Sequence, residues 1–106
     1  MSKNKFSKII AGTMSWGNWG KQFNSQQMIR LMNACLESSV TTFDHADIYG
    51  GGDCEDIFSE AIHMNDEIRE KIILQSKCGI RKGMFDFSKE HILGSVDGIL
   101  KRLRTA

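Results

Sequence analysis

The sequence contains no proline and no long apolar run, and its positive and negative charges nearly cancel. A membrane-spanning helix needs roughly 20 apolar residues in succession, and no segment approaches that length. The net charge is +1, with lysine and arginine spread along the chain, so the basic field that attracts nucleic acids or acidic membranes is missing. We therefore expect neither a nucleic acid nor a membrane as a partner.

Cysteine is also scarce, with three widely spaced positions, Cys35, Cys54 and Cys78. An odd number without regular spacing excludes a disulfide framework and the usual zinc motifs. Each cysteine lies in or beside an apolar run, so we expect small buried thiols in a reducing, cytoplasmic compartment. We expect no metal at His45, Asp47, Asp53 or Cys54, because metal ligands usually show tighter spacing.

Short apolar runs alternate with helical patterns three times along the chain, without a low-complexity linker. The runs cover residues 9–11, 40–43 and 72–74, and the N-caps expected for the helices are Asn24 or Ser25, Asp53, and Ser88. The apolar stripes are Met28, Leu31, Met32, Cys35 and Leu36, then Ile57, Phe58, Ala61 and Ile62, then Ile92, Val96, Ile99, Leu100 and Leu103. Nearly continuous apolar strands suit a parallel sheet covered on both faces. Strands that alternate with helices predict an α/β fold, either a doubly wound sheet or a barrel.

Functional side chains in such folds gather at the carboxyl ends of the parallel strands. Those ends carry Gly12, Thr13 and Met14 after the first strand, Asp44 to Tyr49 after the second, and Lys77 after the third. Each residue taken singly has an ordinary structural interpretation as a loop, packing or solvated side chain. Together they suggest carbonyl reduction, because an ammonium lowers the pKa of a neighbouring phenol. The tyrosine then serves as a general acid, and an aspartate holds the lysine charged and in place.

The three consecutive glycines at positions 50–52 precede the second expected helix and could indicate a phosphate-binding loop. Asp53, Glu55 and Asp56 crowd the same helix start with negative charge, which already complements the helix dipole. A phosphate would be repelled there, so we interpret the glycines as a turn.

Three segments resemble motifs of the aldo-keto reductase family, in the family's order and spacing. They are GTMSWG at residues 12–17, FDHADIYG at residues 43–50 and QSKCG at residues 75–79. The resemblance extends from about residue 8 onward and is closest to a bacterial branch of uncharacterised oxidoreductases. It implies that residues 1–106 form one domain, the first three strand–helix units of a (β/α)8 TIM barrel that is incomplete, with no second domain.

The resemblance also implies an activity, in which NADPH, or less often NADH, delivers hydride to an aldehyde or ketone. In this scheme Tyr49 donates the proton, Lys77 lowers the pKa of Tyr49, and Asp44 pairs with Lys77. The cofactor would lie near Gly12, Thr13, Met14 and Asp44, and Trp16 and Trp19 would line the substrate mouth.

The chain departs from the family pattern, because the fourth catalytic residue, a histidine after the next strand, has no counterpart in it. His45, His63 and His91 do not match that motif position. Three strands also cannot close an eight-stranded barrel, so we expect the 106 residues alone to be inactive and to self-associate through open sheet edges. The alternatives are a non-enzymatic, cofactor-binding regulatory relative, such as the potassium-channel β subunits, and an inert truncated fragment.

Overall fold

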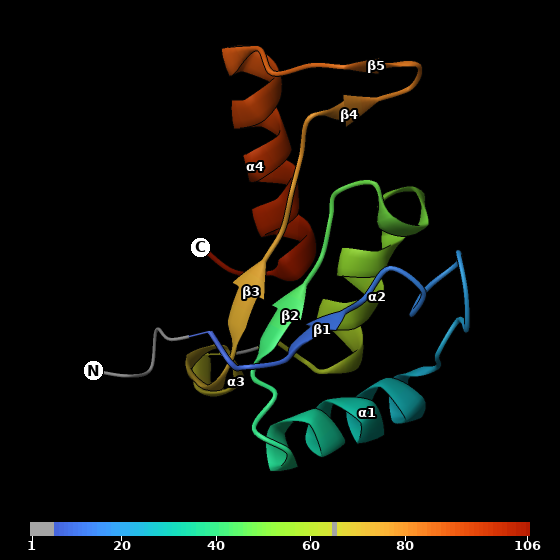
Figure 1. Cartoon of the computed structure of the whole chain (residues 1–106), viewed down its shortest axis with the longest axis vertical. Coiled ribbons are helices and arrows are strands. Elements are labelled where there is room, and N and C mark those ends of the chain that lie inside the picture. The colour runs from blue at the N-terminus through green and yellow to red at the C-terminus, as the bar shows by residue number, and fades with distance from the viewer. Residues whose placement is uncertain (1–5, 65) are drawn as a thin grey trace.

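A computed structural model describes residues 6–64 and 66–106 of the chain. Its centre is a parallel three-stranded sheet with the order β1-β2-β3, shown in Figure 1. The strands are β1 (Ile10–Gly12), β2 (Thr42–Asp44) and β3 (Ile73–Gln75). Their register sets Gly12, Asp44 and Gln75 side by side at the carboxyl ends. The predicted parallel α/β arrangement is confirmed.

Two of the three predicted helix caps are observed. Asn24 caps α1 (Ser25–Glu37) through a reciprocal capping box with Gln27, and Ser88 caps α4 (Lys89–Leu103) by accepting the His91 N–H. The prediction that Asp53 caps α2 (Asp53–Ala61) is wrong, because Gly52 occupies the cap with a φ of 103°. The three glycines form the short 3-10 helix η2 (Tyr49–Gly52) with positive φ angles, which agrees with their interpretation as a turn.

Three short elements were not predicted, α3 (Asp66–Lys71) and a hairpin of β4 (Ile80–Arg81) and β5 (Met84–Phe85). The helix α3 has no buried residue, so no apolar stripe marks it in the sequence. Both hairpin strands are exposed and two residues long, too short for an alternating pattern. Gly83 makes their turn with a φ of 76°.

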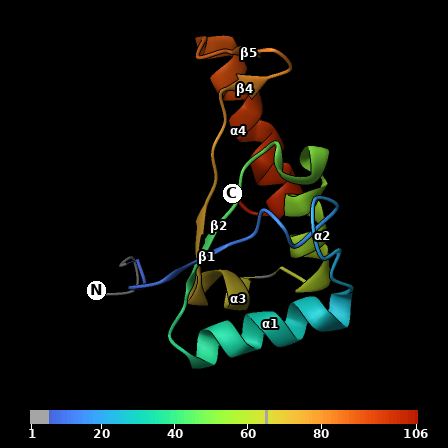
Figure 2. The ribbon, with the colours of Figure 1, turned by 45° about the vertical axis from the view of Figure 1, so that its right-hand side comes forward.

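The core lies between the sheet and the helices, and Figure 2 shows α1, α2 and α4 on the same side of the sheet. Ala11, Phe43 and Leu74 share one register row and belong to this core. On the other face, the side chain of Ile10 is 44% exposed. The prediction that the strands are covered on both faces holds only in part: the helices cover one face, and on the other face Thr42 is fully buried and accepts the Ser7 N–H while Ile10 is exposed.

Helix α4 follows its predicted apolar stripe only in its C-terminal half. Leu103 is buried and Ile99 packs against the core. Ile92 and Val96 remain 37% and 41% exposed, because the N-terminal half of α4 extends past the sheet together with the β4–β5 hairpin (Figure 1). The prediction that Ile92 and Val96 lie on the inner face of this helix is therefore wrong.

The edges of the described sheet are β1 and β3, as the strand order requires. Self-association through these edges stays a prediction. Within the described residues, no helix has the length and apolar character needed to cross a bilayer. The predicted domain range also includes residues 1–5 and 65, which lie outside the described part of the chain.

Candidate active site

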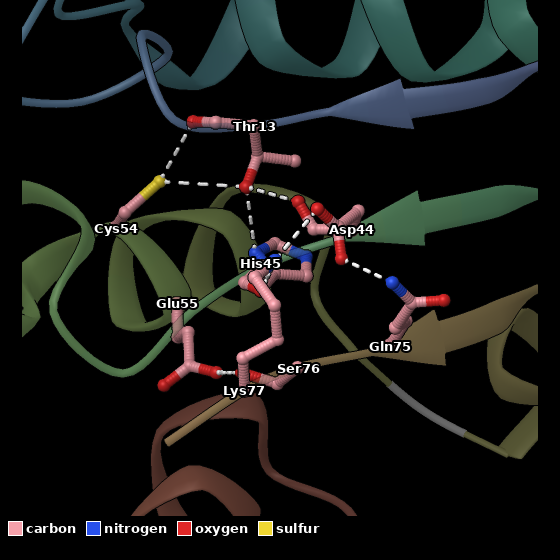
Figure 3. A network of polar contacts seen from close by, with 8 residues as sticks. All are labelled: Thr13, Asp44, His45, Cys54, Glu55, Gln75, Ser76 and Lys77. Carbon is pink, nitrogen blue, oxygen red and sulfur yellow. Dashed lines mark hydrogen bonds and ion pairs between the residues drawn. The ribbon is translucent and has the colours of Figure 1, made fainter. Parts of the chain in front are cut away.

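An ion pair between Lys77 and Asp44 lies at the carboxyl ends of β2 and β3. The Lys77 Nζ donates to Oδ2 of Asp44 at 2.7 Å, and Nε2 of Gln75 donates to Oδ1 of the same carboxylate at 2.6 Å. Figure 3 shows these side chains converging from neighbouring strands. Because the two carboxylate oxygens have different donors, Asp44 is held in one orientation.

The Lys77 ammonium also donates to the backbone oxygen of His45 at 2.7 Å and lies 5.0 Å from the centroid of the Tyr49 ring. Burial lowers the pKa of Lys77, but hydrogen bonds and negative charge from Asp44 and Tyr49 outweigh burial and raise that pKa above its ordinary value. The lysine is therefore charged at neutral pH. The structure brings together Asp44, Tyr49 and Lys77, the three residues singled out in the sequence.

Tyr49 begins η2 and is partly buried. The ring of Trp19 meets it edge-on, with centroids 6.2 Å apart, and Trp19 itself is 53% exposed. A cavity of about 270 Å³ adjoins Tyr49 and Lys77, and its remaining lining comes from Ala46, Asp47, Ile48, Cys78 and Ile80. This surface offers a largely apolar pocket beside a phenol and an ammonium.

Trp16 does not share this exposed position. It is 8% exposed, and its ring lies 6.3 Å from the rings of Phe23, Phe43 and Phe58. The prediction that Trp16 lines a substrate mouth is therefore corrected, because its indole fills the aromatic core instead. Of the two tryptophans, Trp19 lies beside Tyr49.

The loop after β1 carries Gly12, Thr13 and Met14. Thr13 is fully buried, and its backbone N–H and its hydroxyl both donate to the backbone oxygen of Asp44, at 3.1 and 3.0 Å. Gly12 and Met14 are exposed, Met14 by 53%. Of the predicted cofactor residues, Gly12, Met14 and Asp44 have accessible surface. Thr13 has none, and its N–H and hydroxyl instead donate to the backbone of Asp44.

The buried side chain of His45 was missed as a component of the site. Its Nδ1 lies 3.0 Å from the Thr13 hydroxyl, and its ring meets Phe58 at 4.5 Å. Burial, together with the nearby charge of Lys77, lowers the pKa of His45 to about 4 against the opposing influence of Asp44. The available sequence signal is its position directly after Asp44, which neither the metal-ligand nor the catalytic-histidine interpretation uses.

Glu55 is a second buried residue whose position was missed. Its carboxylate is fully buried and accepts from the Ser76 hydroxyl at 2.6 Å and from Nε of Arg102 at 2.9 Å. Ser59 donates its hydroxyl to the Arg102 backbone oxygen. These contacts tie α2 to α4 and to the residue before Lys77. Helical spacing places Glu55 on the face of Phe58 and Ile62, and this signal could have revealed its burial.

Potential metal donors do not gather in the described part of the chain, where no three His, Cys, Asp or Glu side chains form a group suited to an ion. Cys54 instead donates its thiol to the backbone oxygen of Thr13 at 3.1 Å. Burial raises the pKa of Cys54 above its ordinary value. The thiol is therefore a packed, uncharged group at neutral pH.

Comparisons with known proteins give a consistent result. The model of the Aldo/keto reductase family matches residues 8–106. The chain is 38% identical to the oxidoreductase YcsN of Bacillus subtilis (strain 168) over 111 residues, covering 95% of this chain and 36% of YcsN. It is 30% identical to a 6-dehydroglucose reductase of Novosphingobium aromaticivorans over 108 residues, covering 92% of this chain and 36% of that enzyme.

Solved structures are similar over nearly the whole chain. The aldo-keto reductase AKR11C1 from Bacillus halodurans, in its holo form, matches with a TM-score of 0.73 and 30% identity over 94% of this chain and 33% of that chain. The three parallel strand–helix units thus correspond to the first units of a (β/α)8 barrel, and the sheet here is not closed. The chain spans about a third of the length of the relatives it matches.

Proposed function

Because this chain belongs to the aldo-keto reductase family, we propose that it carries the proton-donating part of an active site that reduces an aldehyde or ketone to an alcohol with NAD(P)H. The observation that supports the proposal most directly is the Lys77–Asp44 ion pair, 2.7 Å long, beside the ring of Tyr49. Family members are oxidoreductases that act on small carbonyl compounds.

In the proposed mechanism, Tyr49 donates its phenolic proton to the carbonyl oxygen as that oxygen gains negative charge. The Lys77 ammonium stabilises the phenolate that remains, because opposite charges at short range favour the ionised form. Asp44 keeps Lys77 charged and directed toward Tyr49. Gln75 prevents Asp44 from rotating away.

The exposed end of the sheet suits the nicotinamide part of the cofactor. A Cβ added at Gly12 would meet no atom within 4 Å, so the surface there is open to a flat ring. We assign Gly12, Met14 and Asp44 to this ring, with Thr13 acting through Asp44. When bound, the nicotinamide supplies the hydride. We propose NADPH as the cofactor, with NADH as the alternative.

The substrate proposed for this site is a small carbonyl compound whose apolar part contacts Trp19 and the cavity beside Tyr49. The cavity of about 270 Å³ is slightly smaller than most ligand pockets, which have volumes of roughly 300–1,000 Å³, so it suits a small substrate. We also propose a cytoplasmic location, supported by the free thiols of Cys35, Cys54 and Cys78.

We propose that the 106 residues alone do not complete the reaction, since the chain spans 36% of the length of the reductase from Novosphingobium aromaticivorans. A chimera tests the site without depending on the isolated chain. Residues 8–106 would replace the matching segment of that 6-dehydroglucose reductase, and NAD(P)H consumption would be followed with 6-dehydroglucose. We expect turnover by the chimera and a loss of at least about 100-fold in kcat in its Tyr49→Phe variant.

The matched control is Ser95→Ala, which also removes one hydroxyl group but lies in α4, where that hydroxyl contacts Nε2 of His91 at 3.3 Å. We expect this control to stay within about 2-fold of the parent chimera, as a change outside the site should. Equal turnover by the parent and the Tyr49→Phe variant would contradict the proposal. Cofactor binding without turnover in the folded chimera would favour the non-enzymatic, regulatory alternative.

A further inference from the structure

His45 contributes to the site through its backbone and to the core through its side chain. Its carbonyl oxygen receives the Lys77 ammonium at 2.7 Å, the same distance that separates the ammonium from Asp44 Oδ2. Its N–H donates to the Gln75 backbone oxygen at 2.7 Å. The imidazole lies against Thr13, with Nδ1 3.0 Å from the hydroxyl oxygen, and against Phe58, with ring centroids 4.5 Å apart. The orientation of this one residue therefore decides where the second acceptor for Lys77 lies.

The hydrogen bonds of Thr13 determine which imidazole nitrogen carries the proton. The Thr13 hydroxyl lies 3.0 Å from the Asp44 carbonyl oxygen and 3.0 Å from Nδ1 of His45. A carbonyl can only accept, so the single hydroxyl proton is donated to Asp44. The Thr13 oxygen then accepts from His45, which assigns the proton to Nδ1 and leaves a lone pair on Nε2. Figure 3 shows this chain of contacts from Thr13 to Asp44 and His45.

Packing by itself does not explain a histidine at this position. Nε2 of His45 is buried and has no hydrogen-bond partner, and an unpartnered buried polar atom destabilises a fold. An aliphatic side chain would fill the same space beside Phe58 without that cost. What an aliphatic side chain lacks is the Nδ1–H donor that fastens residue 45 to Thr13. Since burial lowers the pKa of His45 to about 4, the anchor also adds no positive charge next to Lys77.

We propose that His45 is a positioning residue for Lys77: its neutral imidazole, anchored on Thr13, holds the backbone carbonyl that shares the Lys77 ammonium with Asp44 beside Tyr49. This inference rests on the proposed role of Lys77 and extends it to a residue that touches neither substrate nor cofactor. Without the anchor, the backbone hydrogen bond to Gln75 still holds the N–H of residue 45, but its carbonyl can shift, and the ammonium loses one of its two fixed acceptors. The ammonium then leaves its place beside Tyr49.

The test follows the Lys77 ammonium directly by NMR in the 106-residue chain with ¹³C-labelled lysine, with its signal assigned by its loss in Lys77→Arg. In the wild-type chain the pKa of Lys77 lies above the ordinary value. In His45→Leu we expect that pKa to fall, because without the carbonyl of residue 45 the ammonium is held less firmly beside Asp44 and Tyr49, the two groups that raise its pKa. In His45→Asn, whose side-chain amide can donate in the place of Nδ1, we expect the wild-type pKa. An unchanged Lys77 pKa in a folded His45→Leu chain would overturn the proposal.

A second pair of variants and a wild-type measurement decide the matter if His45→Leu does not fold. Thr13→Val removes the hydroxyl that anchors His45 and should lower the Lys77 pKa, whereas Thr13→Ser keeps the hydroxyl and should not. In the wild-type chain, imidazole ¹⁵N spectra should show the proton on Nδ1. A proton on Nε2 would overturn the proposal without any substitution.

The chimera separates this proposal from the proposed function. There His45→Leu should lower kcat about 10-fold with little change in KM, as a displaced catalytic group does, and His45→Asn should restore it. If Tyr49→Phe leaves turnover intact, the reductase proposal fails and the NMR result still decides the role of His45. If Tyr49→Phe abolishes turnover while His45→Leu changes neither kcat nor the Lys77 pKa, only the role of His45 is wrong.

Discussion

Nζ of Lys77 lies 2.7 Å from Oδ2 of Asp44, although the two residues are 33 positions apart in the chain. They meet because β2 and β3 are parallel neighbours, with Asp44 opposite Gln75 in the register. Lys77 follows Gln75 by two residues and therefore extends from the same edge of the sheet. The pairing of two strands thus places a charged ammonium beside Tyr49, which the proposed proton donation needs.

The first prediction concerns the pH dependence that Lys77 gives to stability. The folded chain raises the pKa of Lys77 above its ordinary value of 10.5, so its stabilisation is complete below that value and is lost as pH rises through the folded pKa. The wild-type chain should exceed Lys77→Met in urea midpoint at about pH 8, and the difference should shrink toward about pH 11. Lys71→Met, at a more exposed lysine paired with Glu67, is the control. A pH-independent difference would contradict the prediction.

The second prediction concerns His45 at acid pH. Its pKa is lowered from 6.5 to about 4 in the folded chain, so the stability it contributes is present above pH 6.5 and is lost as pH falls toward 4. The difference of about 2.5 pKa units corresponds to about 3 kcal/mol. Urea unfolding at several pH values should show a steeper acid loss for wild type than for His45→Asn, which cannot titrate. Parallel curves for the two proteins would refute this.

The third prediction concerns the buried pair of Glu55 and Arg102. Arg102→Met leaves the fully buried Glu55 carboxylate without its cation and should cost about 3–5 kcal/mol in the free energy of unfolding. The double variant Glu55→Leu with Arg102→Met removes both charges and should cost less than the single change. Arg30→Met, at an exposed arginine of α1, should change stability by about 0.5 kcal/mol or less. A double variant less stable than Arg102→Met would show that the pair is not the source of the effect.

The fourth prediction distinguishes the two tryptophans. Trp16→Ala removes a core ring that is 8% exposed and should destabilise the chain by about 3–5 kcal/mol. Trp19→Ala should change stability by about 0.5 kcal/mol or less, because Trp19 is 53% exposed, but it should raise KM for the carbonyl substrate in the chimera. Denaturant unfolding and steady-state kinetics check the two halves. Equal destabilisation by both substitutions would contradict the positions described above.

Much of the fold could be predicted because the chain repeats one local pattern. The Asn24 and Ser88 caps and the stripe containing Met28 and Met32 are local signals, and the structure agrees with them. Local sequence signals failed where the burial of a side chain depended on how other segments pack around it. Ile92 has the right spacing for a buried face but remains 37% exposed, in the half of α4 that extends past the sheet.

The candidate site also contains residues that the sequence could identify and roles that it could not. Asp44, Tyr49 and Lys77 could be selected in advance, because strand ends and motif spacing identify their positions in the chain. The roles of Thr13 and Trp16 could not, because burial depends on what packs around a side chain. The Thr13 hydroxyl contacts Asp44 and His45, and Trp16 fills the aromatic core.

The sequence by itself determined the three strand–helix units, the family and the residues at the carboxyl ends of the strands, because periodicity, capping and motif spacing are properties of the chain. Only the tertiary structure decided which polar groups pair inside it. Glu55 meets Arg102 and Ser76, and His45 meets Thr13, across separate elements. Buried polar groups must find partners wherever packing brings donors and acceptors together, and that proximity is not encoded in local sequence.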